Sequence, residues 1–231
     1  MKKLFIAMLS LVVVMLFTAC GGMAENSGST SEQKATMATQ SPPPSSAQAA
    51  IPEKVQGKKI LVAYFSRTGD NYAVGNISKG NTHIVADMIA EATGADIFEI
   101  KTVKPYPESY KECTEVAKKE LVDAVRPELA TTVENMKDYD VIFLGYPIWW
   151  SDMPMAIYSF MESYDFNGKT IIPFCTSAGD VLTGKESSIP NYAKGAKVLP
   201  GFGIEGKRAQ ENPDSVSPQV QQWLAKLGFA N

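Results

Sequence analysis

Two short groups of small polar residues could together bind a phosphate group. One group follows an apolar run at 60–65, and the other opens an amphipathic stretch that ends near Gly94. Their members are Ser66, Arg67, Thr68, Gly69, Asn81 and Thr82. The amphipathic pattern predicts a helix, and a helix start offers free backbone N–H groups and the positive end of the helix dipole to an anion. Arg67 could add a positive charge to this site or lie in solvent.

Two further groups could hold the flat, aromatic part of a ligand. The first consists of Pro147, Ile148, Trp149 and Trp150, and the second of Thr176, Ser177 and Gly179. Indole rings stack on flat aromatic groups, and small residues leave backbone donors accessible. Other interpretations remain open: the indoles could pack against helices, and the hydroxyls of Ser66 and Thr68 could merely form a turn.

Except for Asn81 and Thr82, which open a helix, these groups come at the end of apolar runs that are typical of β-strands. Such runs lie at 60–65, 96–101, 140–146, 169–176 and 197–199, and helical patterns separate most of them. This alternation predicts an α/β fold with a parallel sheet covered by helices on both faces. Since the carboxyl ends of parallel strands share one edge, the polar groups are expected to meet in a crevice there.

Capping residues mark the expected helices. Asn81 or Thr82 is expected to cap the first helix, and Pro154 is expected at the first position of a helix that reaches Tyr164. Another helical face runs from 110 to 124, and a short helix is expected near 187–193. In the last helix Ser217 is expected as the N-cap and Pro218 at the first helical position, with Gly228 at the end.

The motifs YFSRTG, FLGYPIWW and GKTIIPFCTSAG resemble those of the flavodoxin family over residues 58–204. The resemblance implies a flavodoxin-like three-layer sandwich with a five-stranded parallel sheet of order 2-1-3-4-5 and a non-covalently bound FMN. It further implies that Ser66, Thr68, Gly69, Asn81 and Thr82 hold the phosphate, while the loops at 147–150 and 176–179 contact the ring.

Residues 70–80 depart from the family pattern, because they separate Thr68-Gly69 from Asn81-Thr82. If this insert bulges outward, the phosphate site is preserved and the insert becomes a flap beside the ligand. If the turn after Gly69 is a different one, the phosphate site is degraded. Gly75 and Gly80 argue against a continuous helix through the insert.

The N-terminal part resembles the signal of a bacterial lipoprotein. Lys2 and Lys3 precede an apolar run at 4–17, and small residues come directly before Cys20. We expect a signal peptide at 1–19 and a lipid on Cys20, although an ordinary secretory signal remains the alternative. Residues 20–55 are rich in Ser, Thr, Gln, Ala and Pro and are expected to form a disordered tether, which leaves 56–231 as one domain.

Charge, cysteine and histidine content argue against nucleic-acid binding, a disulfide framework and a metal site. The formal net charge is −3, and a mildly acidic domain argues against nucleic acid as a partner. Only Cys113 and Cys175 accompany Cys20, so a disulfide between them is the minor interpretation. With one histidine and no cysteine pair, no metal site is expected.

We therefore expect an extracytoplasmic, membrane-anchored electron-transfer protein that touches the membrane only through its lipid. Its partner would be a redox protein or a small-molecule electron acceptor. No residue is expected to act as a general acid or nucleophile. The alternatives are an NAD(P)H-dependent flavin or quinone reductase, which lacks support from a GxGxxG fingerprint, and a non-redox binding lipoprotein that has lost the flavin.

Overall fold

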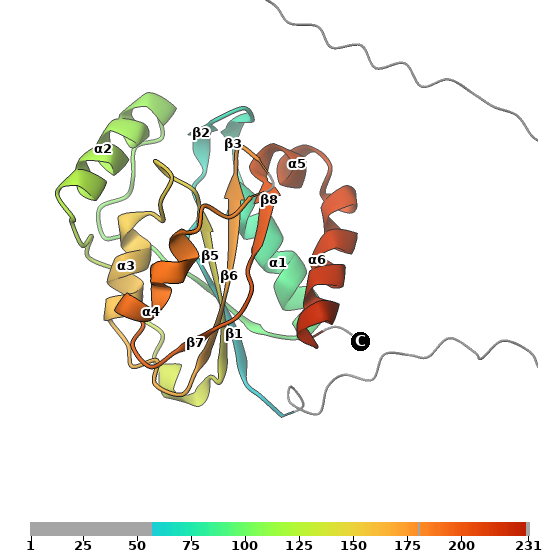
Figure 1. The fold of residues 1–231 in the computed structure, drawn as a ribbon. Coiled ribbons are helices and arrows are strands. Elements are labelled where there is room, and N and C mark those ends of the chain that lie inside the picture. The colour runs from blue at the N-terminus through green and yellow to red at the C-terminus, as the bar shows by residue number, and fades with distance from the viewer. Residues whose placement is uncertain (1–56, 180, 230–231) are drawn as a thin grey trace, which may run out of the picture. The chain divides into compact units, whose positions relative to one another are not determined.

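The computed structural model describes residues 57–179 and 181–229, which form a parallel sheet between two layers of helices (Figure 1). In spatial order the main path of the sheet consists of β4 (Asp96–Glu99), β1 (Ile60–Tyr64), β5 (Val141–Pro147), β6 (Thr170–Ser177) and β7 (Lys197–Val198). Counted along the chain this order is 2-1-3-4-5, and every pairing in the sheet is parallel. The predicted fold class is therefore confirmed.

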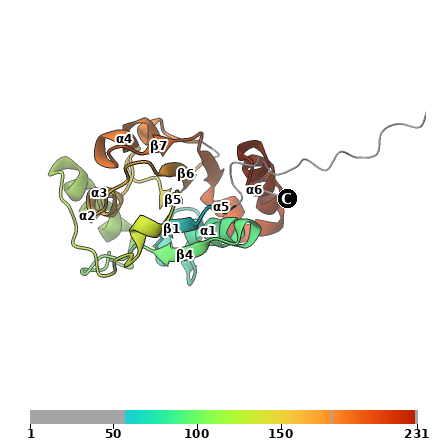
Figure 2. The same ribbon diagram turned by 90° about the horizontal axis from the view of Figure 1, so that it is seen from below.

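The central strands are apolar on both sides because both faces of the sheet are covered. β1 and β5 are buried along nearly their whole length, as expected for a parallel sheet between helix layers. Figure 2 shows the two layers from below. One layer contains α1 (Asn81–Thr93), α5 (Gly206–Glu211) and α6 (Pro213–Leu227), and the other contains α2 (Tyr110–Val122), α3 (Met155–Glu162) and α4 (Ile189–Tyr192). Short 3₁₀ helices lie at Met136–Asp138 and Lys185–Ser188.

The sheet has one more strand than the sequence predicted. The strand β8 (Phe202–Glu205) pairs with the C-terminal half of β6, whereas β7 pairs with its N-terminal end. The predicted strand at 197–199 is therefore the first half of an edge strand that is broken at Pro200-Gly201. Gly201 lies so close to β6 that a Cβ atom there would be 2.6 Å from the carbonyl oxygen of Pro173. Pro173 also has no N–H group to donate to a neighbouring strand.

Three helix starts differ from the prediction. The helix α6 begins at Pro213, and Pro218 lies inside it instead of at its first position. Asn212 is the N-cap residue, and Pro213 occupies the first helical position that was predicted for Pro218. In α3 the cap position is occupied by Pro154 itself, and in α1 by Gly80.

The insert forms an antiparallel hairpin of its own. Its strands are β2 (Gly69–Asn71) and β3 (Gly75–Ile77), and they pair only with each other. Since the hairpin leaves the fold after Thr68 and returns at Gly80, the two ends of the insert meet again. A Cβ atom on Gly80 would be 2.6 Å from the carbonyl oxygen of Arg67.

The expected signal peptide, Cys20 and the tether lie outside the described residues. Within the described ranges, every helix is too short or too polar to cross a membrane. Cys113 and Cys175 are both buried free thiols, so the minor interpretation of a disulfide between them is wrong.

Candidate functional site

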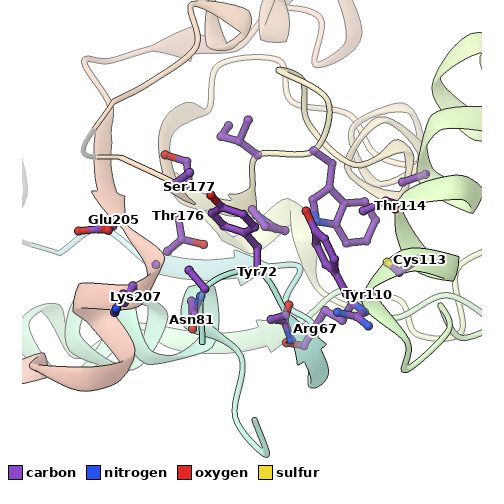
Figure 3. A pocket seen from close by; sticks show the side chains of 18 of the residues that line it. Arg67, Tyr72, Asn81, Tyr110, Cys113, Thr114, Thr176, Ser177, Glu205 and Lys207 are labelled. Carbon is purple, nitrogen blue, oxygen red and sulfur yellow. The ribbon is translucent and has the colours of Figure 1, made fainter. Parts of the chain in front are cut away.

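A cavity of about 430 Å³ lies at the carboxyl ends of β1, β5 and β6. Figure 3 shows it from close by. Most of the predicted site residues line it, namely Arg67, Asn81, Pro147, Ile148, Trp149, Trp150, Thr176 and Ser177. The other predicted residues do not line the cavity but lie in the segments around it, and they are Ser66, Thr68, Gly69, Thr82 and Gly179.

Ser66 supports the start of α1. Its Oγ accepts a hydrogen bond of 3.1 Å from the backbone N–H of His83, in the first turn of the helix. Gly80, at the cap position, has no side chain to do this. Ser66, in the loop after β1, therefore supplies the cap that helices normally take from their own N-cap residue. Thr68 is exposed, and Gly69 is buried at the start of the hairpin.

The first turn of α1 presents donors beside the cavity. Within the part of the chain that the structure describes, the backbone N–H groups of Asn81 and Thr82 have no hydrogen-bond partner. The Thr82 side chain is buried, and its Oγ1 lies 2.8 Å from Oγ1 of Thr176. This hydrogen bond joins α1 to the end of β6. Free N–H groups at a helix start are suited to an anion.

Arg67 is occupied by backbone carbonyl groups and does not lie free in solvent. Its guanidinium group donates to the carbonyl oxygens of Asp70, Pro107 and Glu108. The first of these belongs to the hairpin and the other two to the loop before α2. Arg67 therefore holds the hairpin and this loop together along one wall of the cavity.

The two tryptophans have different surroundings. Trp149 is half-buried and packs edge-on against Phe65 and Tyr106, with ring centroids 5.4 and 4.9 Å apart. Trp150 is 50% exposed, and its Nε1–H donates to the carbonyl oxygen of Thr114 at 2.9 Å. Trp150 has a backbone φ of 51°, which an L residue rarely adopts. The indole of Trp150 is thus held in place while half of it stays accessible.

The loop after β6 is a tight turn of small residues. The backbone N–H of Gly179 donates to Oγ of Ser177 at 3.2 Å. Ser177 lines the cavity, whereas Gly179 does not. A Cβ atom on Gly179 would meet nothing within 4 Å.

Sequence reasoning missed three parts of the cavity wall. The hairpin contributes Asn71, Tyr72 and Ala73, and the helix α2 contributes Tyr110, Cys113, Thr114 and Ala117. The third part is the junction of β8 and α5, which contributes Glu205, Gly206 and Lys207. The hairpin was foreseen only as a flap. The apolar face of α2 was recognised as a helix face but was not connected with the cavity. The third part could not be found because β8 itself was missed.

The cavity-lining thiol is protonated at neutral pH. Burial raises the pKa of Cys113, although the nearby positive charge of Arg67 acts in the opposite direction. Burial likewise raises the pKa of Cys175, to about 12. Neither thiol is therefore suited to nucleophilic attack, because the thiolate is the reactive form. Among the described residues, no group of His, Cys, Asp and Glu side chains is arranged to hold a metal ion.

A family model described as flavodoxin matches residues 59–224. The chain belongs to the flavodoxin family. None of the curated proteins matches this flavodoxin. Solved structures do, and two of them are candidate flavoproteins from Bacteroides species. The one from Bacteroides uniformis is 31% identical, with a TM-score of 0.58, and the match covers 74% of this chain and 99% of that one. The one from Bacteroides eggerthii is 28% identical, also with a TM-score of 0.58, over 73% of this chain and 96% of that one.

A third structure is a flavoprotein from Lactobacillus acidophilus NCFM that was solved in complex with FMN. It is 20% identical to this flavodoxin, with a TM-score of 0.50, over 67% of this chain and 97% of that one. At this level of identity the likeness concerns the fold alone.

Proposed function

We propose that this flavodoxin binds FMN in the cavity and transfers electrons to an acceptor, while a lipid on Cys20 anchors it outside the cytoplasm to a membrane of the bacterial cell envelope. Membership of the flavodoxin family supports FMN as the cofactor. The observation that carries the proposal is the cavity itself, because it joins a helix start with free donors to an accessible indole ring.

The cavity residues fit such a cofactor. The volume of about 430 Å³ lies within the range of cofactor sites. The side chain of Asn81 lines the cavity, and its buried Oδ1 has no hydrogen-bond partner among the described residues. An unsatisfied buried acceptor is costly, so a ligand that brings a hydroxyl donor would stabilise it. The hairpin forms a wall and leaves this space free, as the looped-out form of the insert requires.

The residues divide into those that hold the phosphate and those that hold the ring. The N–H groups at the start of α1 would bind the phosphate, with Ser66 keeping the first turn in place. Trp150 would stack on the ring, since its Nε1–H is fixed to α2, Lys118 Nζ lies 5.0 Å from its ring centroid, and the residue is still 50% exposed. Trp149 and its ring contacts would exclude water from behind. When bound, FMN supplies the transfer of one or two electrons, and no side chain needs to donate or accept a proton.

The visible absorbance of the full chain, purified in detergent, tests the cofactor. We expect a yellow protein, or a colourless one that takes up FMN at micromolar concentration and binds riboflavin more weakly. Trp150→Ala should weaken FMN binding by about tenfold, as the loss of one aromatic contact of roughly 1.4 kcal/mol predicts. Trp149→Ala is the comparison, because its ring is engaged with protein neighbours. A chain that takes up no FMN would contradict the proposal.

The lipid anchor is supported by the sequence around Cys20 and by the two lysines and the apolar run before it. Membrane fractionation of bacteria that express the full chain tests it. We expect the protein in the membrane fraction and a Cys20→Ala variant outside that fraction or retained as an unprocessed precursor. Mass spectrometry of the mature N-terminus is the direct check. An unmodified Cys20 in a processed protein would contradict the anchor.

A further inference from the structure

Two exposed tyrosines face each other at the cavity from separate elements. Tyr72 stands in the turn of the β2–β3 hairpin and is 62% exposed, whereas Tyr110 begins α2 and is 39% exposed. Their ring centroids are 6.1 Å apart, and the ring planes are inclined by 40°. Figure 3 shows the two rings side by side at the cavity, and both residues line it. Large exposed aromatic side chains at a cavity indicate a binding surface.

The backbone holds these two rings in place. The N–H of Asp70 in the hairpin donates to the carbonyl oxygen of Glu108 at 2.9 Å, and the N–H of Tyr110 donates to Oδ2 of Asp70 at 3.4 Å. Arg67 adds its contacts with both segments. Ala73, next to Tyr72, has a φ of 61°, which costs about 1–2 kcal/mol for an L residue. Strain of this kind is typical of functional loops.

The chemistry of this surface favours a flat, uncharged ligand that carries carbonyl groups. The hydroxyls of Tyr72 and Tyr110 have no hydrogen-bond partner in the described part of the chain, so they can donate to a ligand oxygen. The charged side chains of the cavity wall are Arg67, Glu205 and Lys207, and they include both signs. A protein partner that is recognised through its charge would need a patch of one charge sign, positive or negative, at the entrance of the cavity.

We propose that Tyr72 and Tyr110 bind the electron acceptor of this flavodoxin, and that this acceptor is a small quinone and not a protein. The inference rests on the proposed function, because the electrons come from reduced FMN. In the reaction the quinone takes up two electrons and two protons and becomes a hydroquinone, while the reduced FMN gives up two electrons and two protons and becomes oxidised FMN. The two phenol groups position the quinone carbonyls, and the rings cover its face.

Calorimetric titration of the oxidised, FMN-loaded full chain with oxidised 1,4-naphthoquinone tests this without any electron transfer. Tyr72→Ala and Tyr110→Ala should each raise the dissociation constant of the quinone about tenfold, as expected for the loss of an aromatic contact. Tyr72→Phe keeps the ring and should raise it about threefold, which is the loss of roughly one hydrogen bond. Val122→Ala is the matched control, because Val122 is an exposed residue of α2 that does not line the cavity.

FMN affinity is measured in the same variants and separates this inference from the proposed function. Tyr72 lines the same cavity but is the more exposed of the two side chains, so we expect Tyr72→Ala to weaken FMN binding clearly less than Trp150→Ala does. The inference is overturned if the wild-type holoprotein binds no quinone, if the tyrosine variants bind it as tightly as Val122→Ala does, or if Tyr72→Ala lowers FMN affinity as much as Trp150→Ala. A chain that takes up no FMN at all refutes the proposed function first.

Discussion

The substitution Gly80→Ala should destabilise the fold although the backbone at Gly80 suits alanine. Gly80 has φ −70° and ψ 153°, a conformation open to any L residue. By its effect on the unfolded chain alone, alanine there would stabilise the protein by about 0.4–1 kcal/mol. The atoms around Gly80 reverse this effect, so that alanine destabilises the folded protein. A Cβ atom would lie 2.1 Å from Oγ of Ser66, 2.6 Å from the carbonyl oxygen of Arg67 and 3.0 Å from its N atom.

These contacts determine how much Gly80→Ala lowers the free energy of unfolding. The Ser66 hydroxyl can rotate away, but the N–H of His83 then loses its acceptor, which costs about 0.5–2 kcal/mol. The carbonyl group of Arg67 belongs to the backbone and cannot rotate away, and overpacking of this kind costs about 1–3 kcal/mol. After subtraction of the gain from the unfolded chain, we expect a loss of about 2 kcal/mol in the free energy of unfolding.

Urea denaturation of the FMN-free chain measures this free energy, with the slope of the transition as a check on two-state behaviour. Gly179→Ala is the matched control, because the added Cβ meets nothing within 4 Å. It should be neutral or slightly stabilising. The double variant Ser66→Ala/Gly80→Ala should lose less than the sum of the two single variants, since both remove the same cap. An unfolding midpoint of Gly80→Ala equal to that of the wild type would refute the reasoning.

Three further predictions concern the cavity wall and the layer behind it. Thr82→Val leaves the buried hydroxyl of Thr176 without its partner and should cost about 1–3 kcal/mol in urea denaturation, with part recovered when both residues become valine. Arg67→Ala should speed proteolytic cleavage in the hairpin, because the guanidinium group donates to the carbonyl oxygen of Asp70 in the hairpin, whereas Gly179→Ala should not. Burial raises the pKa of Glu120 above 4.5, although the hydrogen bond that Tyr106 donates to its carboxylate lowers this pKa. The folded state therefore binds this proton more tightly, so the free energy of unfolding should fall as the pH rises from about 4.5 through the folded pKa, and Glu120→Gln should flatten that fall.

The fold was largely predictable because its central strands carry an unambiguous signal. A run such as 60–65 has no polar residue to break it, and its burial on both faces explains why. The broken edge strand shows the limit of such reasoning. β8 spans Phe202–Glu205 and contains a glycine, and Pro200-Gly201 before it reads as a turn. Only its pairing with β6 makes this segment a strand, and pairing partners are not visible in a local pattern.

The site was predicted from its loops but not from its walls. Each loop follows a strand, so its place at the sheet edge follows from topology. The position of Tyr72 depends instead on the hairpin, and the hairpin depends on Arg67, whose contacts lie far along the sequence. Ser66 shows the same difficulty within the predicted residues. Its type suited a phosphate ligand, yet its hydroxyl caps the helix.

The break at Pro200-Gly201 divides the sheet edge into two hydrogen-bonded ladders that can open independently. The upper ladder is a strand of 4 residues, and it leads directly into Gly206 at the cavity. Short outer ladders open at a low free energy, so the amide protons of Phe202–Glu205 should exchange with deuterium sooner than those of β5. A ligand in contact with Gly206 would slow that exchange. Hydrogen exchange in this short segment would therefore report whether the cavity is occupied, even by a ligand that does not absorb visible light.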